Sequence, residues 1–205
     1  MTTVTSIDSA LLDVRKAYRL LADYQQRILE LLGFIREELG ASHYYQHQRN
    51  SAPRKLDGLE VSNNAGARFL PFNDISIFWL RNSGQEDPVH CHQKGDLFID
   101  VWVRSDTGNG VDSEEALTVE NSRSELRIYF FQCVDPHKGS CNWRSQIWDQ
   151  TEYPELGEAV ECDGNPGYRA YGEALDLAQC TDENAIRVAL DGLRKRATAK
   201  LDQKI

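Results

Sequence analysis

The hydrophobic pattern at the start of the chain advances in alternating steps of three and four residues. The positions that follow it would line one side of a helix: Leu11, Val14, Tyr18, Leu21, Gln25, Ile28, Leu32, Ile35 and Leu39. This spacing predicts a helix over residues 8–39 that packs against another helix. Ser9 can cap the start of this helix, and Gly40 suits its end.

Two interpretations of what this row of side chains contacts remain open. The row packs against the remainder of the same chain, or it forms an interface with a second copy in a homodimer. Gln25 is its only polar member, and a single polar residue in such a row can fix the register of a helix pair. Gly33 lowers the stability of the helix by about 1 kcal/mol relative to alanine, so packing along the row must hold it. The nine positions are therefore the candidate interface.

Residues 41–67 show no sustained hydrophobic period. Pro53 and Gly58 within a largely polar stretch indicate a linker or an irregular loop. His43 and His47 stand four residues apart, as two ligands on one helical face would, but without the further residues of a known metal motif. We interpret these two histidines as part of a solvated helix end.

From residue 68 onwards the hydrophobic period changes to two. Segments rich in β-branched and aromatic residues, bounded by turn-forming residues, predict three strands: 74–81, 96–104 and 125–133. No helical pattern of crossover length separates these segments, which indicates an antiparallel meander. Residues 116–120 can add a short strand, and Trp143, Ile147 and Trp148 indicate another.

Helical spacing returns in the C-terminal part of the chain. One helix is predicted from the spacing of Tyr168, Tyr171, Leu175 and Ala178. A last helix, with Thr181 as its cap, is predicted from five apolar positions: Ile186, Leu190, Leu193, Ala197 and Leu201. The chain is therefore expected to be a single α+β domain over residues 1–205, with its N-terminal helix at 8–39, a mostly antiparallel sheet within 68–150 and C-terminal helices within 168–201.

The charge of the chain argues against nucleic acid as a partner. Its 205 residues include 23 Lys and Arg against 32 Asp and Glu, a formal net charge of -9. An acidic chain repels the phosphate backbone of nucleic acid over most of its surface and is better suited to a basic partner. No apolar run of about 18 residues is present, and the first residues lack a signal-peptide pattern. We therefore expect a soluble, cytoplasmic protein that does not enter a membrane.

The five cysteines are expected to be reduced thiols. They are an odd number, they are widely spaced, and no two form a CxxC pair: Cys91, Cys133, Cys141, Cys162 and Cys180. This arrangement suits neither a disulfide framework nor a zinc ribbon.

Candidate metal ligands occur together in PVHCHQKGDLFIDVWV, residues 88–103. In an extended strand, alternate side chains share a face, so Asp96 and Asp100 would lie on the face opposite an apolar core row: Leu97, Ile99, Val101 and Val103. If the extended backbone reached back through Gly95, His90 and His92 would join the two aspartates. Two imidazoles and a carboxylate suit Zn, Fe or Mn. The candidate metal ligands are therefore His90, His92 and Asp96, with Asp100 as an additional one.

The spacing of these residues is similar to the first metal motif of the cupins. A glycine, five residues, an HxH pair and a nearby acid correspond here to Gly84, His90, His92 and Asp96. The resemblance implies a metal-dependent enzyme. The chain departs from the motif at Asp96, where glutamate is usual, and at Val103, where glycine is expected, and it lacks the second motif.

A second resemblance involves the neighbouring predicted strand. Asp96 or Asp100, together with Glu125 and Arg127, resembles the acid, acid, basic layout of metal-dependent nucleases, in which carboxylates hold Mg²⁺. Those nucleases usually have lysine where this chain has Arg127. Apart from a divalent metal ion at this face, the sequence implies no cofactor.

An interpretation without a metal is the one that we favour from the sequence. In it, Asp96 and Asp100 pair with arginines on a solvated sheet face, and the two histidines lie in the preceding loop. Short motifs of this kind often match by chance. The sequence then favours an interaction or regulatory protein, such as an acidic neutraliser of a basic partner, that associates through its N-terminal helix. The alternative is a metal-dependent enzyme, of hydrolase or oxygenase type, that uses the face from His90 to Asp100.

Overall fold

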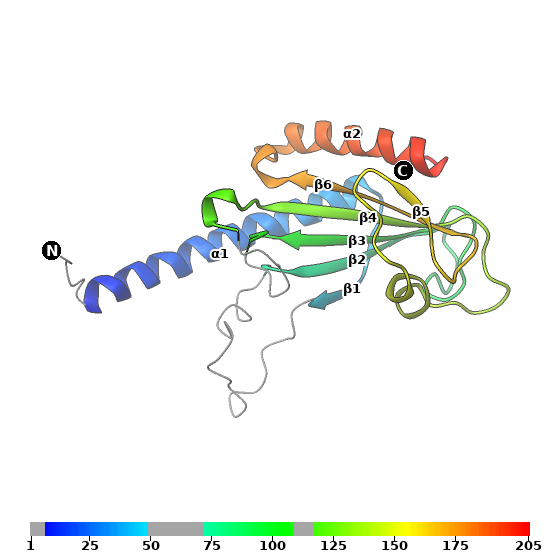
Figure 1. Ribbon diagram of the computed structural model, residues 1–205, viewed down its shortest axis with the longest axis horizontal. Helices are drawn as coiled ribbons and strands as arrows, with labels where there is room; N and C mark the ends of the chain where they lie inside the picture. Colours follow the sequence, from blue (N-terminus) through cyan, green and yellow to red (C-terminus); the bar gives the residue numbers. More distant parts are fainter. Residues whose placement is uncertain (1–6, 49–71, 109–116) are drawn as a thin grey trace, which may run out of the picture. The chain divides into compact units, whose positions relative to one another are not determined.

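The computed structural model describes residues 7–48, 72–108 and 117–205. The chain divides into two compact units, Met1–Ile35 and Arg36–Ile205. The first unit holds most of helix α1 (Ile7–Glu38), and the second holds the sheet and helix α2 (Glu183–Leu201) (Figure 1). The predicted α+β class is confirmed.

Helix α1 matches the predicted range of 8–39 closely. Just beyond its end, Gly40 adopts the left-handed conformation with φ of 61°, which glycine reaches at little cost. The backbone N–H groups of Gly40 and Ala41 donate to the carbonyl groups of Glu37 and Arg36, at 3.0 Å each. These bonds end the helix in the way that the sequence predicted.

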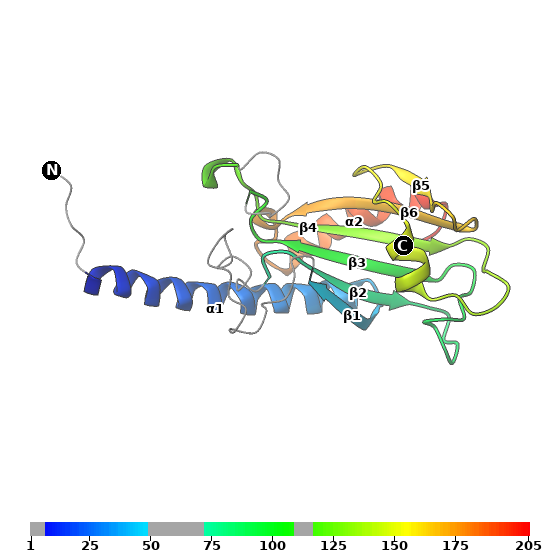
Figure 2. The same ribbon diagram turned by 60° about the horizontal axis from the view of Figure 1, so that its bottom comes forward.

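The second unit is built on one antiparallel sheet whose strand order is β1-β2-β3-β4-β6-β5. Its strands are β1 (Ser42–Gln48), β2 (Ile75–Arg81), β3 (Leu97–Arg104), β4 (Glu125–Cys133), β5 (Ala159–Glu161) and β6 (Tyr168–Asp176). The three strands predicted from the period of two are confirmed as β2, β3 and β4. They form the predicted meander, because strands that are consecutive in the chain are also neighbours in the sheet (Figure 2).

Strand β1 corrects the prediction of an irregular segment after the first helix. His43 and His47 lie in an edge strand that pairs antiparallel with β2, not in a helix end. The register shifts between His43 and Tyr45, and such a bulge breaks the alternation by which strands are recognised. The remainder of the predicted linker, residues 49–67, lies outside the described residues.

Strand β6 corrects the prediction of a helix over residues 168–178. Tyr168 and Ala170 lie on one face of the sheet, and Tyr171 and Leu175 lie on the other. All four side chains are buried. A strand that is covered on both faces lacks the alternation of polar and apolar residues, so its apolar positions can match a helical spacing by chance.

Two predicted short strands are turns of helix instead. Val119–Asn121 forms a 3₁₀ turn, and residue 116 of that predicted strand lies outside the described residues. Trp143–Ile147 forms a π-helical turn that continues into a 3₁₀ turn, Trp148–Gln150. The Asn142 side chain caps the π-helical turn, because its Oδ1 accepts from the backbone N–H groups of Arg144 and Ser145 at 3.0 and 2.9 Å.

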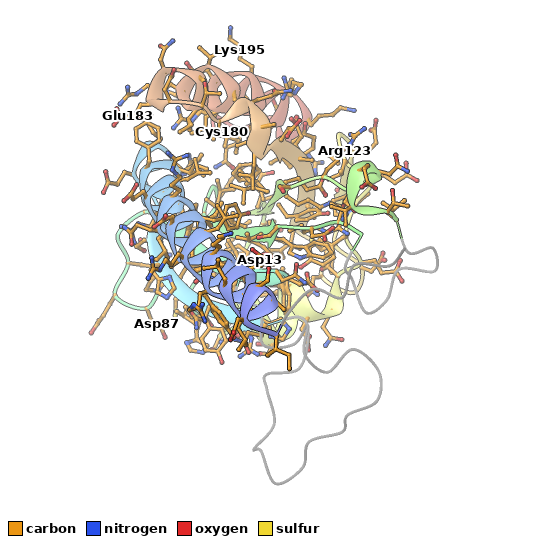
Figure 3. All side chains as sticks on the ribbon, turned by 90° about the vertical axis from the view of Figure 1, so that its left-hand side faces the viewer. Asp13, Asp87, Arg123, Cys180, Glu183 and Lys195 are labelled. Atoms are coloured by element: carbon orange, nitrogen blue, oxygen red, sulfur yellow. The ribbon has the colours of Figure 1, made fainter. Side chains whose placement is uncertain are left out.

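Helix α2 packs beside β6, and its predicted apolar positions are buried: Ile186, Leu190, Leu193, Ala197 and Leu201. Its N-cap is Asp182 rather than the predicted Thr181, because the Asp182 side chain accepts from the backbone N–H of Ala185 at 2.8 Å. Figure 3 shows acidic Glu183 at the start of this helix and Lys195 farther along it. Glu183 in the first turn and Lys200 in the last turn complement the helix dipole.

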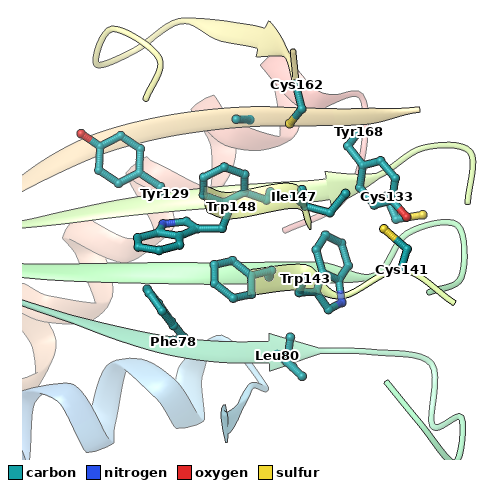
Figure 4. Close-up of a cluster of buried hydrophobic side chains, with 13 residues drawn as sticks. Phe78, Leu80, Tyr129, Cys133, Cys141, Trp143, Ile147, Trp148, Cys162 and Tyr168 are labelled. Atoms are coloured by element: carbon teal, nitrogen blue, oxygen red, sulfur yellow. The ribbon is translucent and has the colours of Figure 1, made fainter. Parts of the chain in front are cut away.

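The opposite face of the sheet carries a cluster of buried aromatic side chains. The segment 141–153 covers this face and contributes Trp143, Ile147 and Trp148 to the cluster (Figure 4). The predicted core row on the other face of β3 is confirmed as fully buried: Leu97, Ile99, Val101 and Val103. Phe98 and Asp100 are buried as well, so β3 has two buried faces rather than one.

Candidate functional site

His90 lies in the loop between β2 and β3, where protein groups contact both nitrogens of its ring. Nδ1 is 3.1 Å from a carboxylate oxygen of Asp87, and Nε2 is 3.0 Å from the Asn142 side-chain nitrogen. Asp87 can only accept and the amide nitrogen can only donate, so the neutral ring donates from Nδ1 and accepts at Nε2. The lone pair that a metal would need is therefore engaged.

His92 is buried and contacts the aromatic side chains of Trp143 and Tyr168. Its ring stacks on Trp143 with centroids 3.9 Å apart. Nε2 lies 3.0 Å from the carbonyl oxygen of Val89, and Nδ1 lies 2.8 Å from the hydroxyl of Tyr168. A carbonyl can only accept, so Nε2 carries the proton and Nδ1 accepts from Tyr168. Burial lowers the pKa of His92 below its usual 6.5, because the charged ring would lose its hydration.

Tyr168 joins His92 to two buried thiols that the sequence analysis did not connect with it. The hydroxyl contacts the thiols of Cys133 and Cys141 as well as the His92 ring, and Figure 4 shows Tyr168 and both thiols at one end of the cluster. Burial raises the pKa of Cys133 to about 11 and also raises those of Cys141 and Tyr168. At neutral pH these groups are a chain of uncharged hydrogen-bonding partners, and the thiols are poor nucleophiles.

Asp96 is buried at the start of β3 and holds the loop before it. One carboxylate oxygen accepts from the backbone N–H and the hydroxyl of Ser83, at 3.0 and 3.2 Å. The other accepts from the Gln85 amide at 2.5 Å and from the backbone N–H of Gln93 at 2.7 Å. The carboxylate thus closes residues 83–96 into a compact loop, which the sequence pattern did not predict.

Asp100 is buried in the middle of β3 beneath segment 141–153. Its Oδ2 accepts from the indole N–H of Trp148 at 3.0 Å and from the hydroxyl of Tyr153 at 2.5 Å. The expectation that Asp96 and Asp100 lie on a solvated face is therefore wrong. It failed because the segment that covers this face comes some 40 residues later in the chain, and its pattern predicted a short strand rather than helical turns that pack over the sheet.

The structure does not bring the predicted metal ligands together. His90, His92 and Asp96 each have partners of their own, and the described part of the chain contains no group of three His, Cys, Asp or Glu that could hold a metal ion. The layout that resembles a nuclease is also dispersed. Arg104 and Arg127 pair with Glu125, and Asp100 lies opposite Tyr129 rather than Glu125.

The environment of His92 predicts an acid-sensitive fold. His92 binds a proton less well in the folded protein than in the unfolded chain. The neutral ring therefore contributes its full stabilisation of the fold above pH 6.5. This contribution is lost as the pH falls toward the lowered pKa of the folded state. We expect urea unfolding between pH 7.5 and 5 to show an extra slope of up to about 1.4 kcal/mol per pH unit. His92→Gln should remove this slope, whereas His43→Gln, at an exposed position on β1, should retain it. An identical pH profile for the two variants would contradict the prediction.

The predicted interface on α1 falls into two parts. Its first members are exposed: Leu11 by 48%, Val14 by 48% and Tyr18 by 71%. Leu21 and Gln25 are half-buried. The later members are buried in the chain: Ile28, Leu32, Ile35 and Leu39. Only the first five positions are therefore open to a partner.

The charges of α1 avoid this exposed apolar row. At 100° per residue, the row is flanked by small residues: Ala10, Ala17 and Ala22. Four of the charged residues lie on the other side of the helix: Asp13, Lys16, Arg19 and Asp23. Arg15 is the one charged residue among positions 10–25 that lies beside the row. Small flanking side chains allow a second helix to approach closely, so this face has the form of a helix-packing surface.

The fold and these contacts define an α+β protein with a six-stranded antiparallel sheet. No helix among the described residues is both long and apolar enough to cross a membrane.

A family model described as PM0109 matches residues 4–202. The uncharacterized protein PM0109 of Pasteurella multocida (strain Pm70) is 40% identical over 205 residues, which cover 97% of this chain and 98% of that protein. The chain therefore belongs to the PM0109 family. No solved structure matches it.

Proposed function

We propose that this protein is an interaction protein that forms a homodimer through the exposed apolar row of α1, residues 11–25. The observation that carries the proposal is the exposure of Leu11, Val14 and Tyr18 on a face that charged side chains avoid. An amphipathic helix whose apolar side chains face water gains free energy when a partner covers them. The function would then depend on the paired state.

The row itself favours a second copy as the partner. A two-fold symmetric pair needs the same complementary patch on both subunits, and one apolar row packed against an identical row meets that need. The charged residues Asp13, Lys16, Arg19 and Asp23 lie on the other side of the helix, so they do not repel one another across such a pair. Gln25, as a polar member of the row, further restricts the alignments that are acceptable.

The test is a double substitution on the exposed row, Leu11→Asp with Tyr18→Asp. Both side chains are exposed, so the fold is retained, while paired carboxylates in an apolar interface would separate the subunits. Light scattering during gel filtration should show a dimer for the unmodified protein at tens of micromolar and a monomer for the variant.

Leu12→Asp with Leu20→Asp is the matched control. These leucines are also exposed, by 46% and 70%, but they lie on the other side of the helix. The control should remain a dimer. A monomeric unmodified protein, or equal dissociation in both variants, would refute the proposal.

A further inference from the structure

A hollow of about 460 Å³ lies between β6, the turn before β5 and helix α2. Four of its lining residues are small or aliphatic: Leu156, Gly157, Ala174 and Ala199. Arg196 and Lys200, four residues apart on α2, line it as well. Its volume falls within the range of sites that take small organic molecules, about 300 to 1,000 Å³.

A buried carboxylate fixes one of these cations. Glu173 lies on the sheet face beneath α2 with 10% of its side chain exposed, whereas the Arg196 side chain is 60% exposed. Arg196 Nε donates to Glu173 at 2.8 Å and Nη2 donates to it at 2.5 Å. The hydroxyl of Tyr171 also donates to Glu173. The guanidinium is therefore held in one orientation while it remains accessible from the hollow.

The cost of burying Glu173 indicates that it has more than a packing role. An apolar residue could fill this position on the helix-covered face, and a buried ion pair is often no more stabilising than such a replacement. What the carboxylate supplies is orientation, because a guanidinium that is already fixed loses little freedom when it binds an anion.

Lys200 offers a second contact that a ligand can take over. Its Nζ lies 2.8 Å from Glu158, and 43% of the Lys200 side chain and 62% of the Glu158 side chain are exposed. An exposed pair of this kind contributes little stability, so a ligand carboxylate can replace Glu158 at small cost. Arg196 and Lys200 each face one carboxylate, Glu173 and Glu158, and only the exposed Glu158 has to move aside for a ligand carboxylate.

We infer that this hollow binds a small organic monocarboxylate with a compact apolar body. The carboxylate contacts Arg196 and Lys200, and the apolar body lies against Leu156, Ala174 and Ala199. Each element of the inference lies within residues 156–200, so it does not depend on the pairing of α1.

The experiment titrates the full chain with benzoate, phenylacetate and 3-phenylpropionate and follows the backbone amide signals by nuclear magnetic resonance. We expect saturable shifts at Gly157, Ala174 and Ala199 with at least one of these probes. The neutral analogue phenylacetamide should bind about tenfold more weakly than phenylacetate, because it lacks the charge-assisted contacts. Arg196→Met should weaken binding of the carboxylate by a similar factor.

Two further variants keep the inference testable if Arg196→Met fails to fold. Ala199→Leu, at an exposed position of α2, should fill the hollow and abolish the shifts. Arg187→Met, which removes an arginine from the same helix outside the hollow, should bind as the unmodified protein does. The inference is overturned if none of the three probes gives saturable shifts, or if Ala199→Leu binds with unchanged affinity.

Discussion

Replacing Gly167 with alanine is expected to lower the free energy of unfolding by about 4 kcal/mol or more, through strain at a crowded backbone site. Gly167 has a φ of 97°, a conformation that residues with a side chain rarely adopt. An added Cβ would lie 2.3 Å from the carbonyl oxygen of Asp135. That backbone cannot move aside, because the N–H groups of Val134 and Asp135 both donate to the carbonyl of Gly167. Urea unfolding at neutral pH measures the loss.

Gly164→Ala separates the two sources of this strain. Gly164 also has a positive φ, 68°, but nothing lies within 4 Å of the position that its Cβ would take. The Gly164→Ala variant should therefore lose only about 1 to 2 kcal/mol of its free energy of unfolding, the cost of a left-handed conformation for a residue with a side chain. Equal losses in the two variants would show that the contact with Asp135 does not limit residue 167.

Asp96→Ala should destabilise the protein by about 2 to 4 kcal/mol and loosen the β2–β3 loop. The substitution removes the acceptor for the backbone N–H groups of Ser83 and Gln93 and for two side chains. A buried donor that loses its partner incurs a cost of about 1 to 3 kcal/mol. Thermal unfolding measures the global effect, and amide exchange at Ser83 and Gln93 reports the local one.

Asp87→Ala is the appropriate comparison within the same loop. Asp87 contacts His90 from an exposed position, and exposed pairs contribute little. Its unfolding midpoint should stay close to that of the unmodified protein. If the Asp96→Ala and Asp87→Ala variants gave the same thermal unfolding and the same amide exchange, the carboxylate of Asp96 would not organise the loop.

The elements that could be predicted from the sequence are those with a clear spacing or composition. Helices α1 and α2 each bury side chains at steps of three and four, and β2, β3 and β4 are rich in β-branched and aromatic residues. Strand β6 was missed because it contains no β-branched residue, and because Tyr168, Tyr171 and Leu175, buried on its two faces, match a helical spacing. Strand β1 was missed because its edge position leaves most of its polar side chains exposed and a bulge breaks its alternation.

The contacts of the predicted site residues could not be derived from local patterns. His92 contacts Tyr168, which is 76 residues away, and Asp100 contacts Trp148, which is 48 residues away. Both partners depend on how the later part of the chain folds back over the sheet. The pairing of Glu173 with Arg196 was missed for the same reason, since Glu173 was expected to lie on a helix.

The end of α2 and the beginning of β3 are joined by one side chain. Gln203 donates from Nε2 to the carbonyl of Gly95 at 2.6 Å, and its Oε1 accepts from Gln132 of β4 at 2.5 Å. Gly95 directly precedes Asp96, which holds the loop. Fraying at the end of α2 would remove this donor from the carbonyl of Gly95, whose own N–H stays bound to the carbonyl of Cys133. Opening near the C-terminus would therefore weaken, without releasing, the start of β3, which lies more than 100 residues away in the chain.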